Sequence, residues 1–286
     1  AYHSYPIGWE VWAYTEWDNQ PLIVKILSLR LLSMSADINT LLKHKVINGW
    51  GLLCLLATPI SILVILEMQS VDLSTGAGVS EMIGYSVRWA IPFIYLVIAA
   101  SSARILFPGP LSNWWLRNRK FIGLTFAVAM AWQGLFIFIM SNSFRDFYFE
   151  DVYYFRDELE GSVGYIFLGF MVITSFHFTR RLLDIKQWKL IQKGGIYFLW
   201  AYPFSVYWWN LYFYENPELI DYIFYWSGFI AFVMRIAAWG KKRKQAATDT
   251  ALMAQLLGWL LVGVGLLASA TGLYWQKSVT SFLTMP

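Results

Sequence analysis

Apolar stretches recur along this chain, and the short connections between them hold most of its charged residues. An α-helix of about 20 apolar residues crosses a bilayer core about 30 Å thick. Seven stretches approach that length, at 47–67, 83–107, 120–141, 161–179, 194–214, 219–239 and 251–273. Because 58% of the 286 residues are hydrophobic and 14% are charged, we predict an all-α integral membrane protein, a bundle of about seven transmembrane helices.

The basic residues fall almost entirely on one side of the predicted helices. Of the 22 Lys and Arg residues, 18 lie in the N-terminal segment and in or beside the connections that follow the second, fourth and sixth stretches. Twelve of the 18 acidic residues lie at the opposite ends. By the positive-inside rule, the N-terminus is predicted to be cytoplasmic and the C-terminus outside, as in a bacterial inner membrane. Basic residues that set topology in this way predict no nucleic-acid partner.

The segments outside the bundle are short. Residues 1–46 are predicted to be cytoplasmic or interfacial, with an interfacial helix at 21–34, where the apolar run is too short to span. The bundle occupies 47–273, and 274–286 form a short outer tail. The outer connection 142–160 mixes seven aromatic with six acidic residues. It is either an aromatic belt contacting membrane lipids or a docking surface for a protein partner in a membrane complex.

Motifs for catalysis are missing from the sequence. It contains no phosphate-binding loop, no HExxH zinc motif and no glycine-rich dinucleotide fingerprint, and its ionisable residues fall near the ends of the predicted spans. These observations favour a role other than catalysis. His177 is the only histidine in a predicted span. It is either an axial haem ligand or an interfacial histidine bonded to a backbone carbonyl or a lipid head group.

Two stretches resemble a known family. The sequence ARILFPGPLSNWWLRNRKFIGLTFAVAMAWQGLF is similar to the second-to-third helix region of the bacterial ferric-reductase-like transmembrane family, which includes the haem-binding membrane subunit of the methionine sulfoxide reductase system. The sequence GYIFLGFMVITSFHFTRRLLDIKQWKLIQKGGIYFLW resembles its fourth-to-fifth helix region. The resemblance covers roughly residues 83–240 and implies a helical scaffold built to hold haem.

The histidines that the resemblance implies are replaced in this chain. The haem-binding position of the third helix falls on Gln133, and a frequent second position one turn earlier falls on Met130. The corresponding positions of the fifth helix fall on Gln192 and, thirteen residues later, on Ser205. Glutamine lacks the basicity of imidazole, and methionine usually ligates haem opposite a histidine. We therefore expect an emptied haem site, in which Gln133 and Ser205 lie at similar depth and can bond each other or a buried ligand.

Three hypotheses for function follow. The first is a haem-free relative of this family, without a cofactor, that serves as a structural or accessory subunit of a larger membrane complex. The second is a b-type cytochrome for transmembrane electron transfer, with His177 and Met130 as unusual ligands of haem b. The third is a membrane protein that binds a lipid, a quinone or a pigment in the former haem cleft, where Gln133 donates a hydrogen bond. The replaced histidines favour the first.

Overall fold

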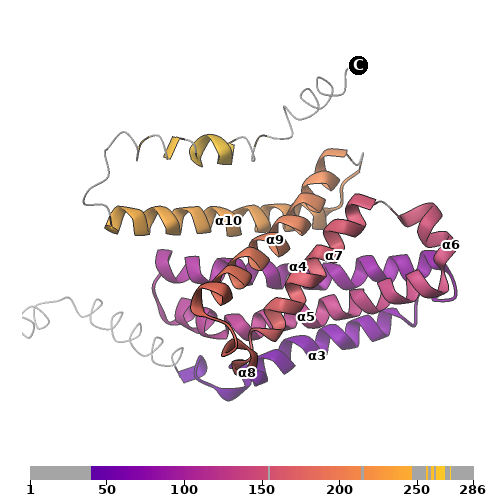
Figure 1. The fold of residues 1–286 in the computed structure, drawn as a ribbon, viewed down its shortest axis with the longest axis horizontal. Helices are drawn as coiled ribbons and strands as arrows, with labels where there is room; N and C mark the ends of the chain where they lie inside the picture. Colours follow the sequence, from indigo (N-terminus) through magenta and orange to yellow (C-terminus); the bar gives the residue numbers. More distant parts are fainter. Residues whose placement is uncertain are drawn as a thin grey trace, which may run out of the picture.

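All regular structure in the described part of the chain is helical (Figure 1). The computed structural model describes residues 40–153, 155–213, 216–246, 256, 259–260, 262–267 and 271. The predicted all-α fold is confirmed over these residues. The elements are a 3-10 turn η1 (Lys45–Ile47), α3 (Trp50–Glu67), α4 (Gly76–Leu106), α5 (Pro110–Ser143), α6 (Arg145–Phe147), a π turn η2 (Tyr148–Val152), α7 (Phe155–Ile173), α8 (His177–Arg180), α9 (Ile185–Phe213) and α10 (Leu219–Ala246).

Four of these helices are long and apolar enough to cross a membrane, as expected of a multi-pass integral membrane protein. They are α3, α4, α5 and α10. The prediction of seven such helices is wrong for the described residues. The predicted interfacial helix at 21–34 lies outside these residues, and the predicted span at 251–273 lies largely outside them.

The two remaining predicted spans fail for different reasons. The stretch 161–179 is divided, because α7 ends at Ile173 and the short helix α8 begins at His177. Helix α7 also starts in the charged sequence FRDELE. The stretch 194–214 does lie in α9, but that helix begins in the basic sequence IKQWKLIQK and continues with many Trp and Tyr residues. The polar N–H and O–H groups of these rings make α9 less apolar than an aliphatic span.

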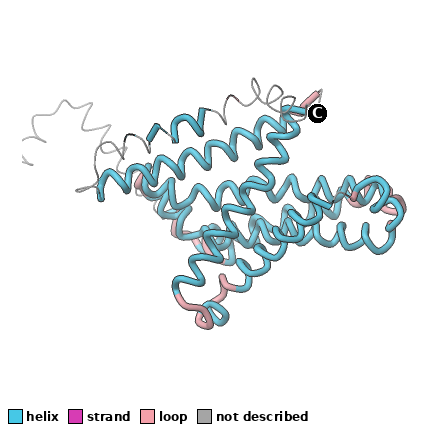
Figure 2. Tube along the Cα trace, turned by 45° about the horizontal axis from the view of Figure 1, so that its top comes forward, coloured by secondary structure: helices cyan, strands magenta, loops and turns pink. Residues whose placement is uncertain are grey.

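Helix α4 is the centre of the bundle. It packs against α5 on one side and against α10 and α9 on the other, while α3 packs on α5 and α7 on α9 (Figures 1 and 2). Over its most apolar 18 residues, α4 has 56% of positions buried, compared with 17% for α3. Buried small residues at 99, 100, 102 and 103 let neighbouring helices approach α4 closely.

The helix ends are fixed by local sequence. Thr75 caps α4, because its hydroxyl accepts a hydrogen bond from the Gly78 amide at 3.1 Å. Helix α4 ends before the sequence FPGP, and Pro110 then opens α5 at a position where no backbone N–H is needed. Three residues therefore suffice to reverse the chain between α4 and α5, the most extensive helix contact of the fold.

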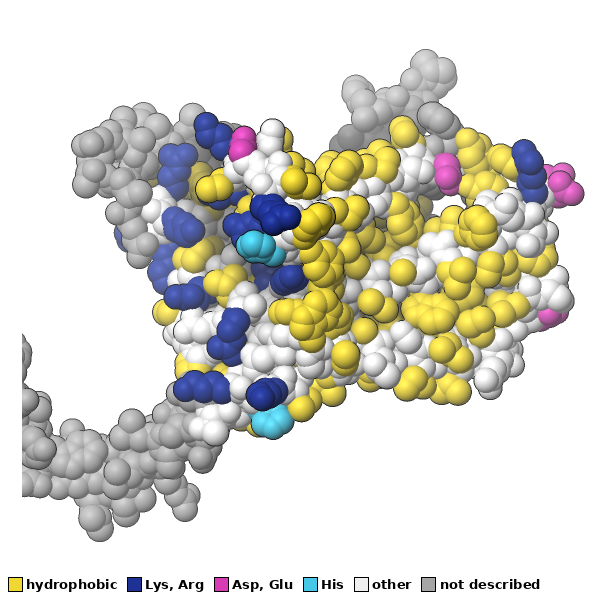
Figure 3. Space-filling view, turned by 60° about the horizontal axis from the view of Figure 1, so that its bottom comes forward, with side chains coloured by type: hydrophobic (Ala, Val, Ile, Leu, Met, Phe, Trp, Pro, Cys, Tyr) yellow, Lys and Arg dark blue, Asp and Glu magenta, His cyan; other side chains and the backbone are white. Residues whose placement is uncertain are grey.

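The two ends of the bundle differ in charge. Lys and Arg side chains gather at one end of the face shown in Figure 3, and hydrophobic side chains cover its middle. We call this the basic end. The start of α5 meets the connection before α3 there, where the Trp114 indole donates to the Ile47 carbonyl at 2.9 Å. The end of α10 meets the end of α4, where Lys241 Nζ donates to the Ile105 carbonyl at 2.8 Å.

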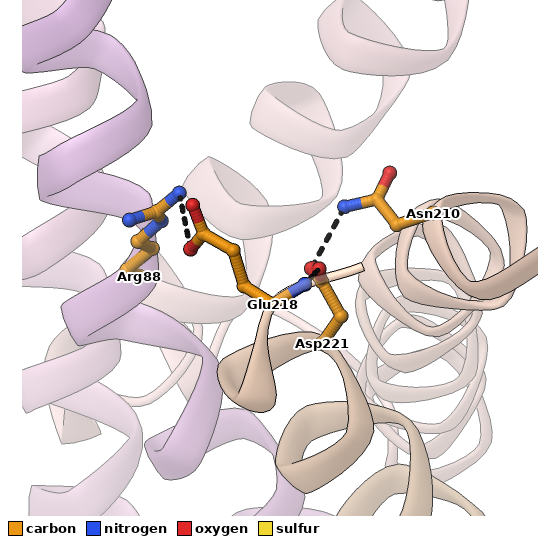
Figure 4. A network of polar contacts seen from close by, with 4 residues as sticks. All are labelled: Arg88, Asn210, Glu218 and Asp221. Carbon is orange, nitrogen blue, oxygen red and sulfur yellow. Dashed lines mark hydrogen bonds and ion pairs between the residues drawn. The ribbon is translucent and has the colours of Figure 1, made fainter. Parts of the chain in front are cut away.

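Carboxylates organise the opposite end, where α4, α9 and α10 meet (Figure 4). Arg88 of α4 forms an ion pair with Glu218 at 3.6 Å. Asn210 of α9 donates to the buried carboxylate of Asp221 at 3.0 Å, and the Glu218 amide donates to the same carboxylate at 2.8 Å. The charge segregation of the sequence is therefore also a property of the folded bundle.

Candidate binding cleft at the basic end

A cleft of about 280 Å³ opens between α4, α5, α7 and α9. We call it the Arg119 cleft. Each helix contributes one part of its wall, and the connection through α8 adds Thr174, Ser175 and Arg180. The cleft is lined by Ile94, Val97, Arg119, Lys120, Gly123, Leu124, Phe126, Leu168, Met171, Val172, Thr174, Ser175, Arg180, Trp188, Gln192, Ile196 and Leu199.

The lining changes from charged to apolar with depth. On α5 the cleft begins at Arg119 and reaches Phe126, and on α9 it runs from Trp188 to Leu199. At 1.5 Å per helical residue, the step from Arg119 to Phe126 is about 10 Å. The deepest walls are aliphatic and aromatic, and the polar groups lie at the basic end. The cleft is therefore amphipathic.

The mouth of the cleft carries three cations, Arg119, Lys120 and Arg180. Arg119 is half-buried and makes no hydrogen bond or ion pair with any described residue. Lys120 lies 4.8 Å from the Phe176 ring centroid, and Arg180 lies 4.4 Å from the Trp188 ring centroid. These ring contacts hold two of the cations without neutralising them. A half-buried guanidinium without an acidic partner favours an anion at this position.

The polar wall of the cleft joins the end of α7 to the start of α9. Gln192 Nε2 donates to Thr174 Oγ1 at 3.0 Å and to the Met171 carbonyl at 3.2 Å. The Trp188 indole donates to the Thr174 carbonyl at 3.2 Å. These bonds satisfy the carbonyls that the end of α7 leaves open, and they fix Gln192 in the wall.

Of the five residues predicted for the former haem site, only Gln192 lines the Arg119 cleft. Gln133 and Met130 lie together on α5, where the Tyr165 hydroxyl donates to Gln133 Oε1 at 2.9 Å and to the Met130 carbonyl at 3.1 Å. Ser205 is exposed and donates to the Tyr202 carbonyl of its own helix at 2.7 Å. Gln133 and Ser205 therefore do not bond each other in this structure, and a bond from either to a buried ligand stays a prediction. His177 is exposed at the start of α8 and lies outside the helices that could span.

The residues around the cleft do not fit haem. A haem iron needs a strong axial ligand, which is most often histidine. Neither histidine of the described residues lines the cleft. Gln192 is also occupied by its bonds to Met171 and Thr174.

The sequence did not single out the cations at the mouth. Arg119 and Lys120 belong to the sequence LRNRK, whose basic residues, like Arg180, indicate membrane topology under the positive-inside rule. The position of Arg119 could have identified it as a binding residue. It lies nine residues after Pro110, the first residue of α5, and a basic residue inside a long apolar helix needs a partner.

Comparison with known proteins gives no further assignment: no protein-family model, no curated protein and no solved structure matches this chain.

Proposed function

We propose that this chain is a multi-pass membrane protein that binds an anionic amphiphile in the Arg119 cleft. The observation that carries the proposal is the half-buried Arg119, which has no acidic partner among the described residues and stands at the mouth of an apolar cleft. A ligand with a carboxylate or phosphate at one end and a hydrocarbon body matches this lining. The proposal shares with the third sequence hypothesis a bound amphiphile, but it puts the ligand in the Arg119 cleft, which Gln133 does not line.

The size of the cleft limits the ligand. At about 280 Å³ it is at the small end of ligand sites in proteins. It suits the anionic end and the first part of one hydrocarbon chain, and the rest of a longer ligand would extend into the bilayer. The orientation that the basic residues favour puts the mouth at the cytoplasmic surface, where anionic lipids are abundant.

Two amphiphiles of matched chain and opposite charge test the proposal. The full chain is purified in an uncharged maltoside detergent and titrated with dodecanoate and with dodecyltrimethylammonium, with binding followed by tryptophan fluorescence. We expect dodecanoate to bind at least ten-fold more tightly, because each favourable charge contact contributes about 1 kcal/mol or more. Equal affinity for the two amphiphiles would contradict the proposal.

Two substitutions assign the binding to the cleft. The variant R119Q/R180Q removes two cations of the mouth and should abolish the preference for dodecanoate. The control R104Q removes an exposed arginine at the end of α4, at the same end of the bundle, which does not line the cleft. It should bind dodecanoate like the wild type. An equal loss in both variants would show that the general positive potential of the basic end, and not the cleft, attracts the ligand.

A second candidate function is the accessory subunit favoured by the sequence, and the outer connection supports it. The rings of Tyr148, Phe149 and Tyr153 cluster there with centroid distances of 5.2, 5.9 and 5.3 Å. Phe149 is 52% exposed and Leu159 is 53% exposed. Exposed apolar side chains beside acidic ones are typical of protein interaction sites. The resemblance to the ferric-reductase-like family remains a prediction.

Native gel electrophoresis of the original membranes tests this second function. A subunit of a complex should migrate well above the 33.1 kDa of the single chain. Phe149→Ser should shift it towards the mass of the single chain, whereas Phe138→Ser, an exposed position nearer the middle of α5, should not. Migration as a single chain in both proteins would remove the support for a complex.

A further inference from the structure

A second cavity lies on the other side of the contact between α4 and α9. It has a volume of about 630 Å³ and is bordered by α4, α9, α10 and one residue of the 262–267 segment. We call it the Arg235 groove. Its lining combines three cations with hydroxyl, aromatic and aliphatic groups and contains no acidic residue. The lining residues are Ser101, Ser102, Ile105, Lys193, Tyr197, Phe232, Arg235, Ile236, Ala238, Trp239, Lys242 and Val262.

Arg235 is held in the groove by neutral groups. Its Nε donates to the Tyr197 hydroxyl at 2.6 Å, and its Nη1 donates to Ser101 Oγ at 3.1 Å and to the Ile98 carbonyl at 3.5 Å. The guanidinium also lies 4.8 Å from the Tyr197 ring centroid. These contacts link α4, α9 and α10 and fix the direction of the side chain. Since every partner is neutral, the positive charge of Arg235 remains uncompensated among the described residues.

Like charges surround Arg235. Lys193 and Lys242 are exposed at the rim of the same groove. Three cations on one cavity wall, with no carboxylate in the lining, favour an anionic ligand.

The groove also has the chemistry of a membrane interface. Trp239 is 49% exposed one turn after Arg235, and indole rings concentrate at the level of lipid head groups. Phe232, Ile236 and Val262 supply apolar wall in the same cavity. Lysines at the rim, an anchored arginine and an apolar wall match the two parts of a phospholipid, its phosphate and its acyl chains.

We propose that the Arg235 groove binds the phosphate of an acidic phospholipid from the leaflet at the basic end. Arg235 is the fixed contact, because its side chain is oriented before the lipid arrives. Lys193 and Lys242 close on the phosphate from the rim, and the acyl chains follow the apolar wall into the bilayer. The inference needs only a membrane-embedded chain, and it stands or fails independently of the Arg119 cleft, since the two cavities have different linings.

Native mass spectrometry of the full chain in maltoside detergent tests this inference. The protein is mixed with phosphatidylglycerol and phosphatidylcholine of identical acyl chains, and the retained lipid is counted. We expect phosphatidylglycerol to be retained at least ten-fold better. The variant K193Q/K242Q should bring this preference close to equal retention, because each lysine near a membrane surface contributes about 1 kcal/mol. It leaves the bonds of Arg235 in place, whereas Arg235→Gln breaks a contact between three helices and is a weaker test.

The matched control is Lys244→Gln, which removes a lysine of α10 two residues beyond Lys242 that does not line the groove. It should keep the wild-type preference. Equal retention of the two lipids, or an equal loss in K244Q and K193Q/K242Q, would overturn the inference. Displacement of phosphatidylglycerol by millimolar inorganic phosphate would also overturn it, because the ligand would then be a free phosphate. R119Q/R180Q should reduce phosphatidylglycerol retention far less than K193Q/K242Q does, because neither arginine lines the groove.

Discussion

Asp221 is a buried carboxylate that joins two helices at the acidic end. It is 6% exposed and accepts hydrogen bonds from the Asn210 side chain and from the Glu218 amide, which precedes the first residue of α10 (Figure 4). A carboxylate at this position also interacts favourably with the N-terminal end of the α10 dipole. One side chain thus both caps α10 and ties it to α9.

Asp221→Ala should destabilise the protein. It removes both acceptors of two part-buried hydrogen bonds, and each bond contributes about 0.5–1.5 kcal/mol, more where the acceptor is charged. The measurement is the midpoint of thermal unfolding in detergent. Glu218→Gln is the control, because its ion pair with Arg88 is 3.6 Å long and both side chains are more than half exposed. Such a pair contributes less than about 1 kcal/mol. A larger effect of E218Q than of D221A would contradict this assignment.

Tyr148 gives the outer connection a high-pH transition. Its hydroxyl donates to Glu158 Oε2 at 2.5 Å. Burial, that hydrogen bond and the charge of Glu158 raise the pKa of Tyr148 from 10.0 to about 12. The neutral phenol is favoured in the folded state, so its contribution to stability is complete below pH 10.0 and is lost as the pH rises through about 12.

Tyrosinate absorbance tests this shift. The titration of Tyr148→Phe, subtracted from that of the wild type, should show one tyrosine that ionises near pH 12. Glu158→Gln should lower that midpoint, since it removes the negative charge beside the phenol. A midpoint at the ordinary value of tyrosine, about 10, would show that the contact with Glu158 does not form in solution.

At the scale of the helices, the sequence predicts where most of the helices lie. It does not predict how long they are or which of them are apolar enough to span. The apolar runs at 47–67, 83–107, 120–141 and 219–239 coincide, to within three residues at their ends, with parts of the four helices that could span. Helix α5 nevertheless begins at Pro110, ten residues before the predicted span, because the amphipathic turn SNWWLRNRK is also helical. Hydropathy finds the apolar part of a helix. It does not find the charged turns that tertiary contacts add at each end.

The candidate site was less predictable than the helices. Gln133 and Ser205 are predicted to lie at similar depth, where they can bond each other or a buried ligand, but depth does not determine which face of a helix meets its neighbour. Ser205 faces away from the packed face of α9, while Gln133 meets Tyr165, a residue of α7. The contact depends on how α5 and α7 cross, and a single sequence carries no direct record of crossing angles.

Gly228 sets the closest approach of α10 to α4 and α9. A Cβ added at Gly228 would lie 2.8 Å from Tyr95 Cζ and 3.0 Å from Phe204 Cδ2. The Gly228 carbonyl also accepts a hydrogen bond from the Trp200 indole at 3.0 Å. Close contact at a glycine with a polar bond beside it is a common way for helices to pack in membranes. The contact at Gly228 thus sets the spacing of α4, α9 and α10, the three helices that border the Arg235 groove.

Gly228→Ala should therefore lower thermal stability by about 1–3 kcal/mol, as over-packed cores do. The control is Gly169→Ala in α7, where an added Cβ meets no atom within 4 Å. That variant should be neutral or slightly stabilising, because alanine favours a helix by up to about 1 kcal/mol over glycine. The midpoints of thermal unfolding of the two variants measure this difference in stability. Equal stability of both would mean that α10 can shift to make room.

At the scale of the whole molecule, both proposed sites lie at the basic end. The Arg119 cleft and the Arg235 groove are lined by different residues of the same two helices, α4 and α9. No acidic residue lines either cavity. The described carboxylates of Glu218 and Asp221 bond to residues of the opposite end. The charge asymmetry from which the orientation is predicted also supplies the cations of both proposed sites.

The same charge asymmetry predicts which side of the membrane each end of the bundle faces. In a Cys54→Ser background, which removes the single cysteine, a new cysteine is placed at Asn216 of the acidic end or at Leu182 of the basic end. Both positions are exposed and lie on the connections at the two ends of α9. A membrane-impermeant maleimide should label Asn216→Cys in intact bacterial cells and Leu182→Cys only after permeabilisation, because basic connections stay in the cytoplasm.

This labelling also decides whether α9 crosses the bilayer, although it is less apolar than the four helices that could span. Its 29 residues extend about 43 Å at 1.5 Å each, enough to pass through a hydrocarbon core of about 30 Å. Labelling of both cysteines from one side would mean that α9 enters the membrane without crossing it. Labelling from opposite sides, with Leu182→Cys outside, would show that the orientation is the reverse of the predicted one. Both proposed anion sites would then face the outer leaflet.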